Sequence, residues 1–274
     1  MTLSTRHKIT YTLFTGSLIL NGLLFYFLLN RFEGLTGVHP LSLVEQNWWF
    51  QDYIDGTTRL GQILLMHGIF TFTTLIGTLI IGLTFKRSSS QEIFYFQLFL
   101  LCLSLLTLRL GSYAVAWYSL PFSYSVLLSR TVLFFRFSAL LFLLLSGLSV
   151  FDSRFQKSDP FFLAAVVISF CLAATVPMGG QFIGNTLSYL PTGELNLFFL
   201  FLIVKLIIPI NFLWFVYQRK TVDYVMLTLA CLLAIVAESL LFYMTFLSFF
   251  LGMSCLLIGG FLFSHRIYKL YLWR

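Results

Sequence analysis

The last third of the chain contains the stretch DYVMLTLACLLAIVAESLLFYMTFLSFFLGMSCLLIGGFLFS, residues 223–264, which carries only two charged residues. The hydrocarbon core of a bilayer is about 30 Å thick and takes about 20 helical residues, each rising about 1.5 Å. The stretch is long enough for two crossings, and its polar interruption falls around Tyr243 to Ser248. We therefore predict two antiparallel membrane helices, 223–245 and 247–264, joined by a tight turn.

Similar apolar blocks fill most of the 274 residues, of which 59% are hydrophobic and 10% are charged. A soluble domain carries roughly 25% charged residues, so this composition excludes a soluble globular enzyme and a disordered chain. We predict an all-α fold, a polytopic transmembrane helix bundle with about eight membrane-spanning helices. One crossing fewer remains open if the last hairpin is re-entrant. The expected crossings are 9–30, 60–85, 93–118, 125–151, 160–178, 195–217, 223–245 and 247–264.

Basic residues are distributed unequally between the two sides of these crossings. Only Arg31 and Arg59 flank one side. Because cytoplasmic loops are enriched in Lys and Arg, we predict a bacterial cytoplasmic (inner) membrane protein with both termini in the cytoplasm. The net charge of +7 thus reports topology, and no nucleic acid partner is expected. The basic residues of the cytoplasmic side are Arg6, Lys8, Lys86, Arg87, Arg154, Lys157, Arg219, Lys220, Arg266, Lys269 and Arg274.

This plan divides one integral membrane domain into four parts. An anchor helix over 9–30 is followed by an outer loop over 31–59. A seven-helix core occupies 60–264, and a short cytoplasmic tail occupies 265–274. A second outer segment, Gly179 to Glu194, is rich in Gly, Asn, Ser and Pro, and we expect it to be irregular.

Ionisable side chains inside the apolar blocks are few, and a charge in hydrocarbon marks a function or a specific pairing. Counted from the outer end of each expected helix, all of them lie about 9–18 Å below the outer boundary. Scattered residues on helices of alternating direction would not share one level, so we predict a single layer in the outer half. The candidate ligand-binding residues are His67, Arg109, Arg130, Arg136, Lys205 and Glu238.

The charges of this layer do not balance. Four cations, Arg109, Arg130, Arg136 and Lys205, accompany the single carboxylate of Glu238. One interpretation is an outward-facing cationic cavity that binds an anionic ligand or a lipid headgroup. The other is structural: Glu238 pairs with Arg109 or Lys205, while Arg130 snorkels outward from near its helix end.

Pro209 adds a mechanical feature to the same region. Proline has no N–H, so it leaves the carbonyl of Lys205, four residues earlier, without its helical partner. Pro209 is therefore a candidate hinge, although proline in a membrane helix usually only bends it.

The common chemistries of membrane proteins lack their residues in this sequence. A transmembrane b-type haem needs paired axial histidines, and His67 is the only histidine inside an apolar block. No HExxH motif, no intramembrane Asp pair, no GxSxG elbow and no phosphate-binding loop is present. We expect no cofactor, no metal site and no catalytic residue, and hence not an enzyme.

The stretch from 60 to 158 contains several short motifs in a fixed order. It resembles the membrane core of bacterial seven-transmembrane receptors that carry diverse intracellular signalling modules. Members typically have a sizeable periplasmic domain and end in a kinase, cyclase or phosphatase, neither of which this sequence shows. The resemblance implies a sensory core that signals through a separate protein. Its motifs are a helix led by Gly61, a basic loop at Lys86 and Arg87, an aromatic entry at Tyr95 and Phe96, a helix ending at Leu108 to Leu110, and Arg130 in the next helix.

Three functions follow from these observations. We favour a receptor-like or sensory integral membrane protein with an outward-facing cationic cavity, which rearranges its helices and signals through a partner protein. A transporter or channel subunit for a small anion would use the same cations as a pathway. A structural subunit of a membrane complex would use them to bridge other chains.

Overall fold

The computed structural model describes most of the chain, and the predicted outer loop 31–59 lies largely outside the described residues. The described ranges are 3–31, 56–85, 90–149, 159–183, 187–191, 194–219 and 222–272.

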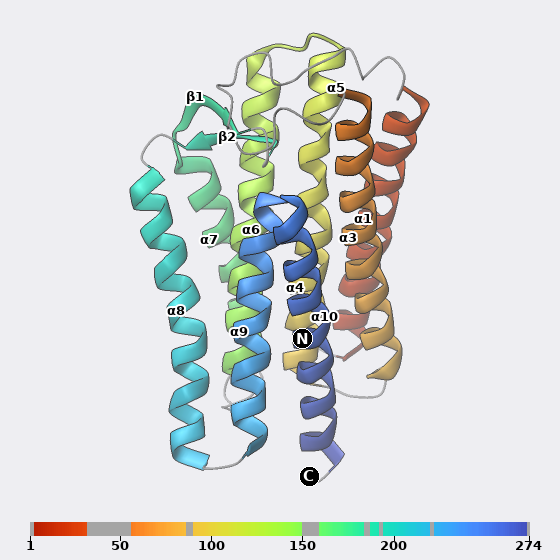
Figure 1. Cartoon of the computed structure of the whole chain (residues 1–274). Coiled ribbons are helices and arrows are strands. Elements are labelled where there is room, and N and C mark those ends of the chain that lie inside the picture. Colours follow the sequence, from red (N-terminus) through yellow and green to blue (C-terminus); the bar gives the residue numbers. More distant parts are fainter. Residues whose placement is uncertain are drawn as a thin grey trace.

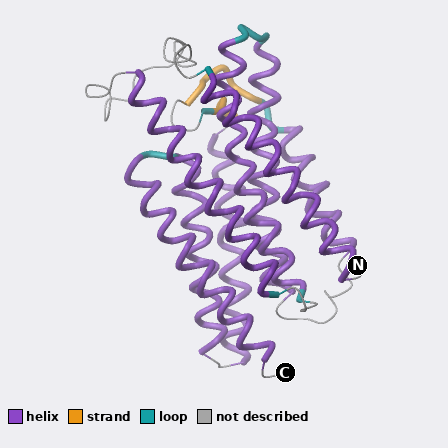
Figure 2. Tube along the Cα trace, turned by 90° about the vertical axis from the view of Figure 1, so that its right-hand side faces the viewer, coloured by secondary structure: helices purple, strands orange, loops and turns teal. Residues whose placement is uncertain are grey.

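The described residues form a bundle of long helices with one short β hairpin (Figure 1). The hairpin lies at the end opposite the C-terminus in both views (Figures 1 and 2). The elements are α1 (Leu3–Asn30), α3 (Gly56–Thr84), α4 (Gln91–Leu105), the 3₁₀ helix η1 (Leu106–Leu110), α5 (Gly111–Trp117), α6 (Phe122–Ser149), α7 (Asp159–Thr175), β1 (Met178–Ile183), β2 (Ser188–Pro191), α8 (Glu194–Arg219), α9 (Val222–Tyr243) and α10 (Phe246–Leu272).

Six helical segments among the described residues are long and apolar enough to cross a membrane. They are α1, α3, the continuous run from α4 to α5, α6, α9 and α10. Two further apolar helices, Pro160–Thr175 in α7 and Phe199–Trp214 in α8, are shorter. A multi-pass helical membrane protein is therefore confirmed, and both chain ends lie in the lower half of Figure 1. The total of about eight crossings and the cytoplasmic position of the termini stay predictions.

Helix α4 is the centre of the bundle. In the spanning segment Gln91–Trp117, which α4 begins, 94% of the residues of its apolar window are buried, against 17% in α1. A helix that is apolar on all its faces is suited to the centre of a bundle, because none of its faces prefers water. Helices α1, α3 and α6 pack around α4. The peripheral helices expose Leu, Ile and Phe side chains outward, as a lipid-facing surface requires.

Helix α1 is attached to this core by its polar side chains. The hydroxyl groups of Ser17 and Ser104 lie 2.7 Å apart, and Asn21 donates to the Ser104 carbonyl at 3.4 Å. The outward side of α1 carries exposed Leu23 and Tyr26. The predicted anchor is thus part of the bundle, with Ser17 and Asn21 inside and Leu23 and Tyr26 outside.

The predicted tight hairpin between the last two helices is confirmed. Helix α9 ends at Tyr243, and Met244 adopts a positive φ of 46°, the left-handed conformation that ends many helices. Thr245 and Ser248 then cap α10 reciprocally, because each backbone N–H donates to the other residue's hydroxyl group. In Figure 1 this turn lies well below the upper end of α6, so it is set down into the height of the bundle.

Two segments differ from the sequence-based expectation. Gly179 to Glu194 is not wholly irregular, because β1 and β2 pair antiparallel with Met178 opposite Pro191 and Ile183 opposite Ser188. The Gly and Asn content that suggested an irregular loop is equally typical of hairpin turns. The expected tail 265–274 is mostly helical, since α10 continues to Leu272.

Neighbouring glycines of α10 give a first prediction. A Cβ on Gly259 would lie 3.0 Å from the backbone oxygen of Ala230 on α9, whereas one on Gly260 would meet only a ring atom of Phe96 at 4.0 Å. We expect Gly259→Ala to lower the free energy of unfolding by about 1–3 kcal/mol, because helix backbones must separate. Gly260→Ala, the matched control, should be neutral or stabilising by up to about 1 kcal/mol. Thermal unfolding in mild detergent measures both, and equal effects would contradict the close approach of α9 and α10.

Candidate functional site

The carboxylate of Glu238 is the centre of a buried ionic network. Glu238 lies on α9 with no exposed surface. Arg136 of α6 places its Nε 2.6 Å from Oε1, and Lys205 of α8 places its Nζ 2.7 Å from Oε2. Lys205 also donates to the hydroxyl group of Ser239 at 2.7 Å. Both carboxylate oxygens are therefore engaged, and three helices meet at one residue.

Two phenyl rings enclose the Arg136 guanidinium. Its Cζ lies 3.6 Å from the centroid of Phe242 and 4.3 Å from that of Phe201. The negative face of an aromatic ring attracts a cation, and the attraction is stronger where water is excluded. Phe201 and Lys205 are four residues apart on α8, as are Glu238 and Phe242 on α9. This spacing places each ring beside the charge on the same helix face.

Arg109 is fully buried and caps the end of α9. It donates through Nη1 to the carbonyl of Phe242 and through Nη2 to the carbonyl of Leu241, the latter at 3.2 Å. The last carbonyls of a helix have no N–H partner within the helix and carry partial negative charge. The buried guanidinium of Arg109 supplies N–H donors to these carbonyls and a positive charge beside the negative helix end. Arg109 therefore holds the α9–α10 turn in place.

The third donor of Arg109 defines the state of His67. Arg109 Nε donates to His67 Nε2 at 2.8 Å, and His67 Nδ1 lies 2.9 Å from the carbonyl of Ile63. An arginine N–H only donates, so Nε2 accepts and the ring proton is on Nδ1, which donates to Ile63. His67 is thus a neutral imidazole in this arrangement, and it connects α3 to the network.

A change of helix type determines the direction in which the Arg109 side chain points. The expected continuous helix 93–118 is divided into α4, the 3₁₀ helix η1 and α5, and Arg109 lies in η1. A 3₁₀ segment has about 3.0 residues per turn instead of about 3.6, so it rotates every later side chain relative to an α-helix. Just before Arg109, Thr107 bonds the hydroxyl group of Thr71 on α3 at 2.6 Å. Such segments inside helices often mark hinges.

Arg130 does not join the network. It precedes Arg136 by six residues on α6, which corresponds to about 9 Å along the axis and about 240° around it. Arg130 therefore faces another direction, and its buried Nε has no hydrogen-bond partner among the described residues. Pro209 is buried within α8, one turn beyond Lys205, and the helix runs through it from Glu194 to Arg219. Its role as a hinge stays a prediction.

The structure brings together all the candidate residues except Arg130. Glu238 pairs with Arg136 and Lys205, while Arg109 binds backbone carbonyls and a histidine instead. Composition alone did not indicate that Phe201, Phe242 and the end of α9 would surround the cations. In this arrangement every cation of the network contacts protein atoms, so an anion entering there would have to displace Glu238 or a carbonyl.

No protein-family model matches the chain, and no curated protein or solved structure matches it either. The resemblance of residues 60–158 to bacterial seven-transmembrane receptors therefore stays an expectation, and the function has to be argued from the network itself.

Proposed function

We propose that this chain is a receptor-like or sensory protein of a bacterial inner membrane, whose switch is the network around Glu238. One observation carries the proposal: Arg136 and Lys205 share the buried carboxylate of Glu238, and Arg109 binds the end of the same helix α9. Through these contacts and the bond from Arg109 to His67, the network links α3, η1, α6, α8 and α9. A buried charge is costly unless it is paired, so any movement of one helix must exchange partners rather than lose them. Such a network favours discrete arrangements.

The excess of positive charge indicates the kind of signal. An anionic ligand or lipid headgroup that reaches the network competes with Glu238 for Arg136 and Lys205. It shifts the helices only if it binds the rearranged state more tightly than the present one. Release of Glu238 would free α9 and, through the tight turn, α10, whose far end carries Arg266 and Lys269. A separate signalling protein could read that movement.

The interior below the network favours a receptor over an anion transporter. Phe212 follows Lys205 by seven residues on α8, so it lies on the same helix face about 11 Å further along the axis. Its ring has no exposed surface, and a Cβ on Gly147 of α6 would lie 2.6 Å from it. An aromatic side chain thus fills the space between α6 and α8 beyond the cations, where a permeating anion would need a path.

Two measurements separate the proposed functions. Spin labels at Tyr217 on α8 and Tyr268 on α10, both exposed, report the distance between these helices in nanodiscs. We expect Glu238→Gln to add a second distance population and Asp223→Asn, a carboxylate change elsewhere on α9, to leave the distribution unchanged. An unchanged distribution in Glu238→Gln contradicts the switch.

Anion flux in liposomes tests the alternative. We expect chloride and inorganic phosphate to cross wild-type proteoliposomes no faster than empty ones. Uptake that is lost in Arg136→Leu would instead establish an anion transporter. Constant stoichiometry with another membrane complex, together with an unchanged spin-label distance, would identify a structural subunit.

A further inference from the structure

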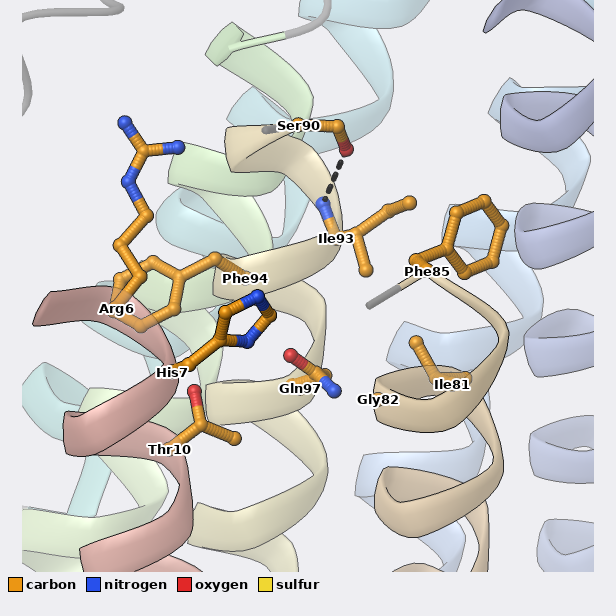
Figure 3. A pocket seen from close by; sticks show the side chains of 10 residues that line it. All are labelled: Arg6, His7, Thr10, Ile81, Gly82, Phe85, Ser90, Ile93, Phe94 and Gln97. Carbon is orange, nitrogen blue, oxygen red and sulfur yellow. Dashed lines mark hydrogen bonds between the residues drawn. The ribbon is translucent and has the colours of Figure 1, made fainter. Parts of the chain in front are cut away.

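A cleft lies between α1, α3 and α4, near the first residues of α1 and α4 (Figure 3). It has two adjoining shallow parts, each with a cavity volume of about 20 Å³, that share His7, Thr10, Gly82 and Gln97. The ionic network is formed by other residues, near the end of α9. The cleft is therefore a separate feature that the proposed switch does not use.

One part of the cleft holds its basic and most of its polar side chains, and we call it the polar part. Its lining combines Arg6, His7, Thr10, Ser90 and Gln97 with apolar Ile81, Phe85, Ile93 and Phe94. In Figure 3 the His7 ring and the Gln97 amide are neighbours in the view, between α1 and α3, and the Arg6 guanidinium extends toward the level of Ser90. Ser90 is the N-cap of α4, where its hydroxyl group accepts from Ile93 at 3.4 Å. The partial positive charge of this helix end adds to that of Arg6.

The described lining of both parts contains no Asp or Glu. The acidic residue of the first turn of α4, Glu92, is two residues from Ser90 and lies on another face of the helix, where its carbonyl accepts from Ser146 at 2.8 Å. The electrostatic character of the cleft is thus suited to an anion.

The other part of the cleft is apolar and opens outward. Tyr11, Phe14, Leu79 and Leu83 line it, and Tyr11, Leu79 and Leu83 are 47%, 40% and 59% exposed. Gly82 joins the two parts, and a Cβ there would lie 2.9 Å from Gln97 Nε2. A side chain at this position would narrow the passage between the polar part and the apolar part.

We propose that this cleft binds one anionic glycerophospholipid. The phosphate lies at the polar part beside Arg6 and His7, and an acyl chain follows the apolar part between α1 and α3. A lipid matches both halves at once, because its charge and its hydrocarbon are joined at the depth where α1 passes from basic to apolar residues. A free phosphate would use only the polar half.

Cross-linking of the wild-type protein tests the position of the acyl chain. Phosphatidylglycerol with a diazirine in one acyl chain is incorporated into nanodiscs with the full chain and photolysed. We expect the labelled peptides to contain residues 10–14 and 79–83. Labelling spread evenly over exposed residues elsewhere, such as Leu213 of α8 and Phe261 of α10, would overturn the proposal.

Matched variants test the phosphate end by native mass spectrometry. We expect Arg6→Gln to lower phosphatidylglycerol retention about fivefold, the factor for one cation at an anionic lipid surface, and to leave phosphatidylcholine retention unchanged. Lys8→Gln removes the same charge from an exposed residue that does not line the cleft, and should lower retention less than about twofold. Equal losses in both variants would mean unspecific surface attraction and would contradict the site.

Gly82→Leu provides a second route that keeps every charge. It should lower phosphatidylglycerol retention about as much as Arg6→Gln, because it blocks the passage, and unchanged retention would overturn the proposal. Competition with inorganic phosphate completes the test. At a concentration equal to that of phosphatidylglycerol, phosphate should not displace the lipid from the protein. Displacement by phosphate alone would show that the cleft binds the free anion and not a lipid.

Discussion

Glu238→Gln is expected to lower the free energy of unfolding by about 3–5 kcal/mol. The amide keeps the volume of the carboxylate but leaves the buried charges of Arg136 and Lys205 without their counter-charge. A charge that remains buried after its partner is removed costs far more than the pair contributes. Unfolding in mixed micelles, followed by tryptophan fluorescence, measures the loss.

The same helix supplies the control for this variant. Asp223 on α9 pairs with Arg266 at 2.9 Å, and both side chains are partly exposed, at 25% and 21%. Asp223→Asn should cost less than about 1 kcal/mol, because water and lipid headgroups solvate the arginine that remains. Similar losses in the two variants would show that burial does not make the Glu238 pairs special.

A triple variant separates stability from switching. Arg136→Met, Lys205→Met and Glu238→Leu together remove every charge of the triad, and buried ion pairs replaced by apolar groups are often neutral or stabilising. We expect the free energy of unfolding of this variant to be higher than that of the wild type or at most about 1 kcal/mol lower. Unlike Glu238→Gln, the variant should show a single spin-label distance.

Arg109→Met is expected to lower the free energy of unfolding by at least about 3 kcal/mol. The change leaves the carbonyls of Leu241 and Phe242 and the Nε2 of His67 buried without a donor. Each such acceptor costs about 1–3 kcal/mol. Amide hydrogen exchange should also increase around the α9–α10 turn, since Arg109 is the donor that holds it.

Arg130→Met is the matched control for this second variant. It removes the same side chain from the neighbouring helix, at a position whose Nε has no hydrogen-bond partner among the described residues. The expected loss is less than about 1 kcal/mol, with unchanged exchange at the turn. If Arg130→Met and Arg109→Met cost the same, the loss would come from the missing charge and not from the capping of α9.

The sequence predicts the membrane class and the level of the charged layer, because both depend only on position along the chain. Hydropathy locates the helices, and a rise of about 1.5 Å per residue converts position into depth. Which of the charged side chains contact one another depends instead on the angle around the helix axis at which each one points. Arg130 and Arg136 belong to the same predicted layer, although they lie about 9 Å apart along α6. They point in different directions, and helix periodicity would have separated them.

Arg109 shows where such reasoning stops. Its direction depends on the 3₁₀ geometry of η1, and two of its three partners are main-chain carbonyls, which are present in every sequence. Neither has a residue-type signal. By contrast, Phe201 and Phe242 had one, since each is four residues from a charged residue on its own helix. Aromatic rings are easily assigned to lipid or core alone, although they also stabilise buried cations.

The inward polar face of α1 has a consequence for biogenesis. Asn21 bonds the carbonyl of Ser104, which is made 83 residues later. At about 5–20 residues per second, the ribosome needs about 4–17 s to deliver that partner. During this interval the Asn21 amide can donate to the carbonyl of Ser17, which lies 2.9 Å away in the same helix. The first helix therefore reaches the insertion machinery with a temporary partner for the Asn21 side chain, and it completes its docking only once α4 has followed it into the membrane.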